Sequence, residues 1–405
     1  MSALLEKRGP VFDPTLVGAC FLLAVIGTIM VGSASISLAE RNTGEPLFYL
    51  YRHLAALGLG AAAFAFAASV PIESWYRLHW LLLAAAFALL VLVLVPSLSE
   101  PINGARRWLA IGPVTLQASE PARIAILMFI AAYGARRAEE LSTSLKGFLK
   151  PLLLVAVAAV LLLGEPDFGA VVVLTAASLG LLFVAGARLR DFSLAVVAGA
   201  AALAVLAYTS EYRWKRILAF LNPWDEPFGS DFQLTQSLIA IGRGGVAGVG
   251  LGESVQKLFY LPEAHTDFVF AVLAEELGLA GSTLVIVLFG MIVYRSIALG
   301  RQALRQSLPF HGLLAVGIGL LLGLEAFINI GVNAGVLPTK GLALPLVSYG
   351  RSSTVATLGA LGLLARIYYE VNVRGRKAGA AVQPRSSERE EAAERPQRKK
   401  RRRGR

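Results

Sequence analysis

Long uncharged apolar stretches recur along the chain and alternate with short polar segments that carry most of the charges. A helix of about 20 apolar residues crosses the hydrocarbon core of a bilayer. Continuous runs, without the residue-by-residue alternation of a barrel strand, favour helices. The pattern therefore predicts an all-α polytopic membrane protein with about ten transmembrane helices. The expected spans are residues 15–39, 53–71, 79–97, 120–134, 151–163, 168–186, 191–209, 267–294, 311–333 and 350–372.

Composition agrees with this prediction. Of the 405 residues, 56% are hydrophobic and only 16% are charged, whereas a soluble domain carries about 25% charged residues. The single cysteine, Cys20, excludes a disulfide within the chain. The first apolar run follows Lys7 and Arg8 as a signal peptide would, but it is longer than the usual apolar region of about 7–15 residues. We therefore expect a retained span.

The basic residues predict the orientation, because cytoplasmic loops are enriched in Lys and Arg. A cytoplasmic N-terminus places twelve of them inside: Lys7, Arg8, Arg77, Arg136, Arg137, Lys146, Lys150, Arg188, Arg190, Arg295, Arg301 and Arg305. The short outer loops then hold only Arg41, Arg52, Arg106, Arg107 and Lys340. Both termini are expected in the cytoplasm.

Three parts are expected along the chain: a cytoplasmic N-terminus at 1–14, a membrane domain at 15–373 and a basic tail at 374–405. The tail holds thirteen Lys or Arg and four Glu, so a disordered cytoplasmic segment at a membrane surface or a partner is predicted. A nucleic-acid role is disfavoured, because a basic segment after a final span is typical of a topology signal.

The longest segment between spans, residues 210–266, is predicted to be extracytoplasmic and to lie between the seventh and eighth helices. Loops longer than about 15 residues in a compact architecture are usually functional or disordered. This one is rich in aromatic residues, and its leucine and isoleucine run near 234–241 predicts a short interfacial helix. Chemistry at the outer face is therefore expected.

Several catalytic motifs are missing from the sequence. There is no phosphate-binding GxxxxGK[ST] loop, no HExxH, no CxxC and no GxSxG. The glycine-rich stretch at 242–252 does not follow a strand of a βαβ unit, so it is interpreted as a flexible loop. No nucleotide cofactor is expected, and an enzyme of this kind needs a substrate that carries its own activated bond.

The strongest polar constellation lies at 262–268, where the outer loop enters the eighth span. Glu263 and Asp267 are four residues apart, so an early helix start would place both carboxylates on one face. A carboxylate there can act as a general base. Alternatively, Thr266 or Asp267 caps the helix. Spacing alone favours the cap.

Carboxylates also occur within the predicted membrane spans. Glu275 and Glu276 follow Asp267 in the same predicted span, and charges inside a membrane segment need a polar partner or a wet cavity. The ninth span offers Glu325, Asn329 and Asn333 at successive four-residue steps, and the fourth offers Arg123 one turn after Glu120. These five residues, Glu275, Glu276, Glu325, Asn329 and Asn333, are interpreted as structural polar residues, and substrate contact remains the alternative.

Outer-side cations form another group: Arg106, Arg107, Arg213, Arg216 and Lys340. Guanidinium groups suit phosphate recognition, although each residue alone could be a solvated surface charge. Glu165 and Asp167 flank a proline in a predicted tight outer turn, where they could bind a divalent cation or the substrate.

The quoted segments resemble the SEDS family of shape, elongation, division and sporulation proteins. The similarity rests on Gly-Ala-Arg-Arg-Trp at 104–108, Glu-Pro-Asp-Phe-Gly at 165–169, Leu-Pro-Glu-Ala-His-Thr-Asp-Phe at 261–268, Glu-Glu-Leu-Gly at 275–278 and Leu-Pro-Thr-Lys-Gly through Ser-Tyr-Gly at 337–350. It covers nearly the whole chain except the tail. Pro-Thr-Lys-Gly at 338–341 resembles the division branch more than the elongation branch.

The resemblance implies a ten-span peptidoglycan glycosyltransferase of the bacterial inner membrane that polymerises lipid II at the division septum. It also implies a class B penicillin-binding protein transpeptidase as partner, beside other division proteins, and makes Asp267 the catalytic base rather than a cap. Lipid II brings a diphosphate leaving group, which replaces a nucleotide as energy source.

Substrate-binding roles are predicted for Arg106, Arg107, Trp108, Glu165, Asp167, Arg213, Arg216, Glu263, His265, Lys340 and Ser352. A divalent cation, Mg²⁺ or Mn²⁺, is expected to assist, its ligands being unknown. The chain departs from the family pattern at Pro121 and Arg123, and at Arg351, where a glycine is usual. The alternatives are a lipid II flippase using Glu275, Glu276 and Glu325, or a division scaffold without activity.

Overall fold

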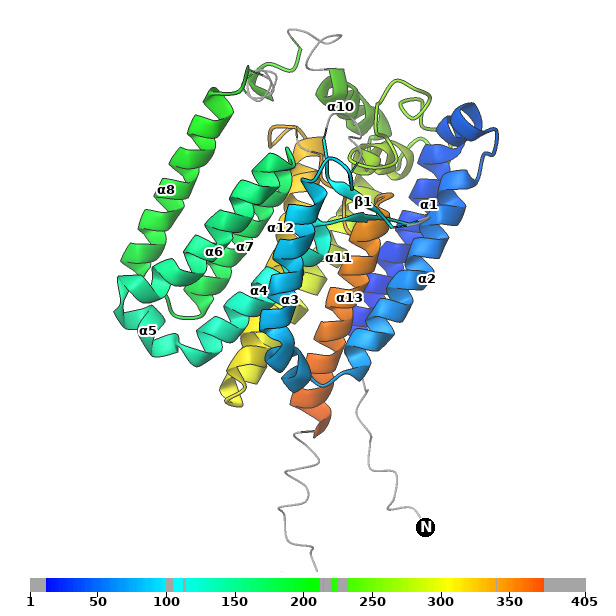
Figure 1. The fold of residues 1–405 in the computed structure, drawn as a ribbon. Coiled ribbons are helices and arrows are strands. Elements are labelled where there is room, and N and C mark those ends of the chain that lie inside the picture. The colour runs from blue at the N-terminus through cyan, green and yellow to red at the C-terminus, as the bar shows by residue number, and fades with distance from the viewer. Residues whose placement is uncertain are drawn as a thin grey trace, which may run out of the picture.

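The computed structural model describes residues 12–99, 105–111, 114–211, 214, 220–224, 232–339 and 341–374. These residues form a helical bundle (Figure 1). Its helices are α1 (Pro14–Thr43), α2 (Phe48–Ser69), α3 (Ile72–Val93), α4 (Ser119–Arg136), α5 (Ala138–Thr143), α6 (Leu145–Gly164), α7 (Phe168–Val184), α8 (Leu189–Tyr208), α10 (Phe232–Gly244), α11 (Val269–Arg305), α12 (Pro309–Asn333) and α13 (Arg351–Tyr368), followed by a π-helical turn, η1 (Tyr369–Arg374).

The chain is a multi-pass membrane protein. Within the described residues, seven helices are long and apolar enough to cross a bilayer: α1, α2, α3, α6, α8, α11 and α12. The other three predicted spans coincide with α4, α7 and α13, so every predicted span has a helix, while the total of ten crossings stays a prediction. The all-α architecture is confirmed.

One element was not predicted, a short antiparallel hairpin of β1 (Trp108–Ile111) and β2 (Val114–Gln117). Its register pairs Trp108 with Gln117 and Ala110 with Thr115. Together with α10 it marks one end of the bundle, which we call the loop end (Figure 1). The helix predicted near 234–241 is confirmed as α10.

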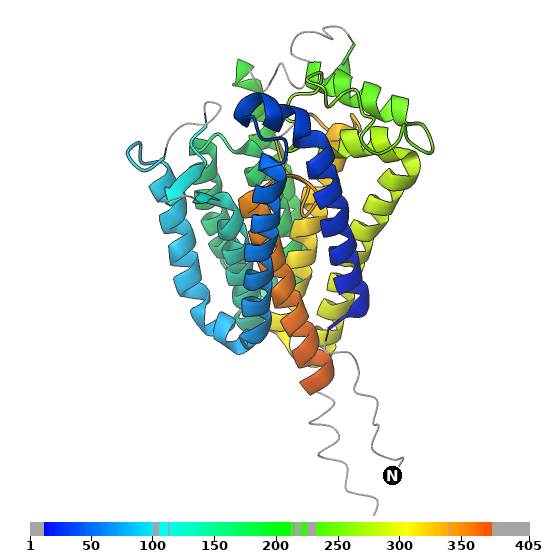
Figure 2. The same cartoon turned by 90° about the vertical axis from the view of Figure 1, so that its right-hand side faces the viewer.

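The described chain begins in α1 and finishes after α13 at the end of the bundle opposite the loop end (Figures 1 and 2). Figure 2 shows α1 and α2 side by side, with α13 against α2. This arrangement is the one expected if both termini lie on the same side of a membrane. Which side that is stays a prediction, and residues 1–11 and 375–405, with the N-terminal and tail predictions, lie outside the described residues.

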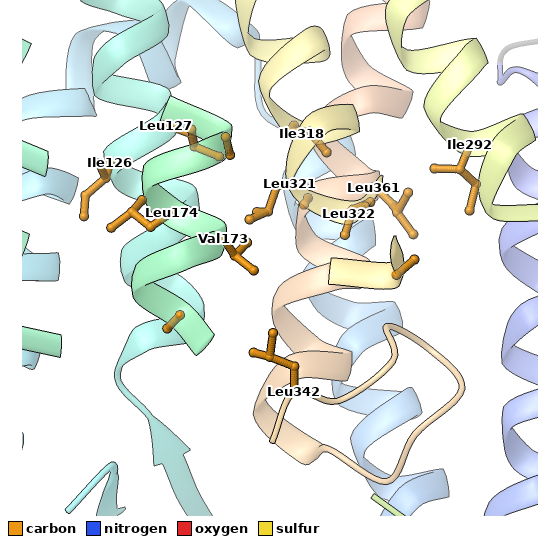
Figure 3. Close-up of a cluster of buried hydrophobic side chains, with 14 of the residues drawn as sticks. Ile126, Leu127, Val173, Leu174, Ile292, Ile318, Leu321, Leu322, Leu342 and Leu361 are labelled. Carbon is orange, nitrogen blue, oxygen red and sulfur yellow. The ribbon is translucent and has the colours of Figure 1, made fainter. Parts of the chain in front are cut away.

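The core is centred on α12. In its most apolar stretch of 18 residues 67% are buried, whereas in that of α8 only 11% are buried. Ile318, Leu321 and Leu322 of α12 pack among side chains of α4, α7 and α13 (Figure 3). The exposed apolar residues of α8 are therefore expected to face lipid, which solvates apolar side chains as well as a protein core does.

The helix α11 is interrupted at Gly278, which has φ 65° and ψ −161°. Its backbone approaches the loop at 244–250: Leu279 N donates to Gly245 O at 2.9 Å, and Gly250 N donates to Glu276 O at 3.1 Å. A Cβ at 278 would lie 2.3 Å from Gly248 N, so only glycine fits. The span predicted at 267–294 is therefore present as part of α11, with a kink at Gly278 that the sequence pattern did not predict.

Candidate active site

A cavity of about 1050 Å³ lies at the loop end of the bundle. Its wall combines the β-hairpin, the turn between α6 and α7, the segment before α11 and the segment that enters α13. The predicted site residues that line it are Arg107, Trp108, Asp167, Glu263, His265, Asp267 and Ser352. Residues as far apart in sequence as Arg107 and Ser352 thus line one cavity, as is common for a substrate site.

Asp267 lies in the turn that leads into α11, and its main chain is fixed by α12. The main-chain oxygen of Asp267 accepts hydrogen bonds from Asn329 Nδ2 at 2.9 Å and from Asn333 Nδ2 at 3.0 Å. Asn333 Oδ1 accepts from Ala271 N at 3.0 Å, an amide of the first turn of α11 that also donates to Phe268 O at 3.1 Å. Both asparagines therefore hold the main chain of Asp267 in place.

Neither Thr266 nor Asp267 occupies the cap position at the start of α11. The residue at the cap position, Phe268, has no side-chain cap, and the Thr266 hydroxyl donates instead to Glu263 Oε2 at 2.6 Å. Asn333 Oδ1 accepts from an amide of the first turn, and Asp267 lines the cavity.

The Asp267 carboxylate also lies against the backbone at Gly341. A Cβ placed on residue 341 would be 2.7 Å from Asp267 Oδ2, well inside van der Waals contact. A side chain at this position would displace the carboxylate. The neighbouring Lys340, predicted to bind the substrate, lies outside the described residues, as do Arg213 and Arg216.

Three aromatic rings form one wall of the cavity. The ring centroids of Tyr49 and His265 are 4.9 Å apart, those of Tyr49 and Tyr349 5.2 Å, and those of His265 and Tyr349 5.5 Å. Burial lowers the pKa of His265, with a smaller opposing effect of the Glu263 charge, which favours the neutral imidazole. Such a wall suits the apolar face of a sugar ring.

The hairpin is tied to the turn between α6 and α7. Arg107 Nε donates to the main-chain oxygen of Glu165 at 3.2 Å, and a second guanidinium nitrogen donates to that of Pro166. Both acceptors are neutral carbonyl groups, so the arginine keeps its charge at the cavity wall, next to Trp108. Arg106, the other predicted residue here, does not line the cavity.

The two carboxylates of this turn differ. Asp167 lines the cavity and caps α7, since its Oδ1 accepts from Ala170 N at 3.2 Å. Glu165 is buried outside the cavity lining, and its carboxylate oxygens have no hydrogen-bond partner in the described structure. Burial, followed by the charge of Asp167 and opposed by that of Arg107, raises the pKa of Glu165 to about 8. At neutral pH this side chain is therefore mostly protonated.

A buried ion network lies below the cavity. Arg123 Nη2 is 2.6 Å from Glu120 Oε1, and Arg123 Nη1 is 2.5 Å from Glu325 Oε1. The charges that the sequence places in α4 and α12 thus pair with each other, as charges inside a membrane bundle must. Glu120 also lines the cavity.

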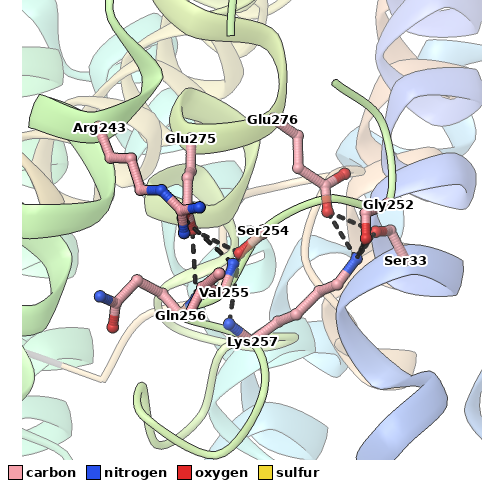
Figure 4. Close-up of polar contacts among 9 residues, drawn as sticks. All are labelled: Ser33, Arg243, Gly252, Ser254, Val255, Gln256, Lys257, Glu275 and Glu276. Carbon is pink, nitrogen blue, oxygen red and sulfur yellow. Dashed lines mark hydrogen bonds and ion pairs between the residues drawn. The ribbon is translucent and has the colours of Figure 1, made fainter. Parts of the chain in front are cut away.

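Glu275 and Glu276 find partners in the segment at 232–266 and in α1 rather than in α4 or α12, where they were expected (Figure 4). Glu275 accepts from Arg243 Nη1 at 3.0 Å and from Ser254 Oγ at 2.5 Å. Glu276 accepts from Lys257 Nζ at 2.8 Å and from Ser33 Oγ at 2.6 Å. The loop folds back over the break at Gly278, which the sequence pattern did not indicate.

Some cavity residues were not among the predicted site residues. Tyr49, Gln117 and Arg351 line the cavity, yet only Arg351 had a signal, an arginine where the resembling family has glycine. In the part of the chain that the structure describes, no three His, Cys, Asp or Glu side chains converge as metal ligands.

Comparisons with known proteins identify the family. The FtsW/RodA/SpoVE family model, described as cell cycle protein, matches residues 14–373. The chain belongs to this family. Its members include a probable peptidoglycan glycosyltransferase FtsW of Thioalkalivibrio sulfidiphilus, 53% identical over 345 residues, which are 85% of this chain and 86% of that protein. The FtsW of Halorhodospira halophila, described in the same way, is 50% identical over 379 residues, 92% of this chain and 95% of that protein.

Solved structures of the family share the fold. One, from work on a peptidoglycan synthase complex that coordinates polymerization and crosslinking, has a TM-score of 0.73 at 29% identity and covers 89% of this chain and 98% of its own. The rod shape determining protein RodA of Thermus thermophilus has a TM-score of 0.66 at 29% identity, with the same coverage. The resemblance found in the sequence is confirmed.

Proposed function

We propose that the chain is a peptidoglycan glycosyltransferase that polymerises lipid II during septal wall synthesis. The observation that carries the proposal is the placement of the Asp267 carboxylate in a cavity of about 1050 Å³ that also holds Arg107, Trp108 and Arg351. The names of relatives about half identical to this chain support the same activity.

The proposed reaction is an inverting sugar transfer. Asp267 accepts the proton of the acceptor 4-hydroxyl, whose oxygen forms a bond to the anomeric carbon of the lipid-linked sugar. The bond from that carbon to the diphosphate oxygen breaks, and undecaprenyl diphosphate leaves with the electron pair. Proton transfer to a positioned carboxylate contributes on the order of 10²–10⁴-fold.

Charge on the departing diphosphate is stabilised by cations at the same cavity. Arg107 lies in the wall with its charge unpaired by any carboxylate in the described structure, and we assign Lys340, from its sequence position alone, a similar role. Donors that are fixed before the reaction stabilise developing charge without reorganisation. The neutral His265, beside Tyr49 and Tyr349, would contact the sugar.

We also propose that a divalent cation, Mg²⁺ or Mn²⁺, assists the reaction. Mg²⁺ is commonly held by one or two carboxylates together with substrate phosphates, and Glu263 and Asp167 both line the cavity. The cation would neutralise phosphate charge, and the protein's own residues would still bind and orient the sugars. Titration of Mg²⁺ and Mn²⁺ against chelator tests this point.

A class B penicillin-binding protein transpeptidase is the proposed partner, and the division septum the proposed location. The support is the similarity to a synthase complex described as coordinating polymerization and crosslinking. The basic tail after residue 374 is proposed to recruit the chain to the membrane surface or other division proteins.

The proposal is tested with Asp267→Asn, assayed on purified lipid II with the partner present. The variant should be expressed and should bind its partner, but form no glycan strands. Polymer at the wild-type rate would overturn the assignment. Detergent solution has no second compartment, so strand formation there separates a polymerase from a flippase.

A further inference from the structure

The first residue of α13 is Arg351, at the wall of the cavity. Arg351 lines the cavity, and its Nη2 donates to the hydroxyl of Thr115 at 2.6 Å. No described acidic residue forms an ion pair with it, although carboxylates line the same cavity. A guanidinium held at a cavity wall by a neutral hydroxyl is available to an anionic ligand.

The main chain adds further donors at the same place. The residue before the helix, Gly350, offers no side-chain cap, and the first helical hydrogen bond runs from Thr354 N to Gly350 O at 2.8 Å. The amide groups of residues 351–353 therefore have no acceptor among the described residues. Such free amides, with the positive end of the helix dipole, favour an anion.

Ser353 gives an independent indication of a ligand. Its side chain lines the cavity although the residue is only 7% exposed. Its hydroxyl makes no hydrogen bond to any residue that the structure describes. The Ser353 hydroxyl is not among the fully buried unpaired polar atoms of the described structure, so it is accessible to a partner that enters the cavity.

We propose that Arg351, Ser353 and the first-turn amides of α13 form a phosphate site that binds the diphosphate of the lipid-linked substrate. A guanidinium, a hydroxyl and helix N-terminal amides together provide the donors that phosphate oxygens use. The inference rests on the proposed function and adds residues that the sequence analysis did not assign to the site.

The hairpin holds this site in place. Ser352 Oγ accepts from Gln117 N at 3.0 Å and donates to Thr115 O at 3.2 Å. With the bond from Arg351 to Thr115, three hydrogen bonds join β2 to the start of α13. The start of α13 is therefore joined through β2 to the hairpin that carries Trp108.

The contribution of the arginine charge can be separated from that of the other donors by replacing Arg351 with glycine. A glycine there would leave the amides and Ser353 but remove the charge. We therefore expect this chain to bind the diphosphate more tightly, and with a steeper salt dependence, than its own Arg351→Gly variant.

The test uses the full chain in nanodiscs and four variants: Arg351→Gln, Arg351→Lys, Ser353→Ala and, as a matched control, Arg41→Gln. Arg41 lies on the loop-end side of α1 with its guanidinium 5.1 Å from the centre of the Phe259 ring, outside the cavity lining. Binding of radiolabelled undecaprenyl diphosphate is measured by scintillation proximity, with undecaprenyl phosphate, undecaprenol and inorganic pyrophosphate as competitors.

Arg351→Gln should weaken binding of undecaprenyl diphosphate about tenfold, the usual effect of losing one charge-assisted hydrogen bond. Arg351→Lys should recover part of the loss, Ser353→Ala should show a smaller loss, and Arg41→Gln should bind as the wild type does. Competition by pyrophosphate would show that the phosphates themselves are recognised. If only the lipid-linked forms compete, the lipid contributes as well, and the site still stands.

Two results would overturn the site: unchanged affinity of Arg351→Gln, or equal competition by undecaprenol and undecaprenyl diphosphate in the wild type. Asp267→Asn keeps this failure distinct from failure of the proposed function. That variant should bind the diphosphate lipid normally while polymerising nothing. A polymerase that loses activity at Asp267 but keeps its affinity at Arg351→Gln would refute the phosphate site alone.

Discussion

Asn333 of α12 donates a hydrogen bond of 3.0 Å from Nδ2 to the main-chain oxygen of Asp267. Its Oδ1 accepts from Ala271 N, so one buried amide side chain holds both the proposed base and the first turn of α11. The base therefore depends on α12 for its position, although no α12 residue lines the cavity.

Asn333→Ala should lower kcat strongly, on the order of tenfold or more, because small displacements of a catalytic group are costly. It should also destabilise the protein by about 1–3 kcal/mol, since buried partners lose their hydrogen bonds. Steady-state kinetics and thermal melts measure the two effects. A variant that melts earlier but retains its full kcat would show that Asn333 does not position the base.

Gly341→Ala should reduce kcat with little effect on folding. The added Cβ would lie 2.7 Å from Asp267 Oδ2, so the carboxylate must move. Gly58→Ala in α2 is the matched control, since a Cβ there meets no atom within 4 Å. Equal activity of the two variants would mean that the Asp267 side chain has no fixed place.

Glu165→Gln should raise thermal stability increasingly as the pH rises from about 5 to 8. The pKa of Glu165 is raised to about 8 by burial, so between its unfolded and folded pKa values the folded protein holds a proton that the unfolded chain has lost. Stability of the wild type therefore falls through this range and levels off above it, whereas glutamine is neutral throughout.

Melting temperatures at several pH values give the result, with Glu45→Gln, an exposed loop residue, as control. If the difference between Glu165→Gln and the wild type is the same at pH 5 and pH 8, Glu165 ionises as an exposed carboxylate does, and the account of its environment is incorrect.

Lys257→Met should destabilise the loop that covers the break in α11. Lys257 pairs with Glu276 at 2.8 Å, with side-chain exposures of 10% and 0%, and removing one partner of a buried pair costs about 3–5 kcal/mol. Adding Glu276→Gln should restore much of the loss, because no buried charge then remains. Hydrogen exchange at 246–257 reports the local opening. Additive losses in the double variant would exclude this coupling.

The sequence determined the membrane helices, because a segment in lipid must satisfy its own backbone hydrogen bonds and an apolar run therefore has few structures open to it. The span predicted at 120–134 is α4, at 119–136. The span predicted from Pro151 begins six residues earlier in α6, since lysines at a membrane surface can stay helical and the proline lies inside the helix. The motifs around Asp267 likewise identified the family.

Only the tertiary structure decided which side chains meet. Glu275 and Glu276 were expected to pair within the bundle, but the outer loop reaches them because α11 breaks at Gly278. Arg351 lines the cavity and donates to Thr115 of the hairpin. The sequence showed no alternation of apolar and polar residues that predicted this hairpin. Helix formation depends on neighbours a few residues apart, whereas Arg351 and Thr115 are 236 residues apart. Their approach is set by how the loops and helices pack.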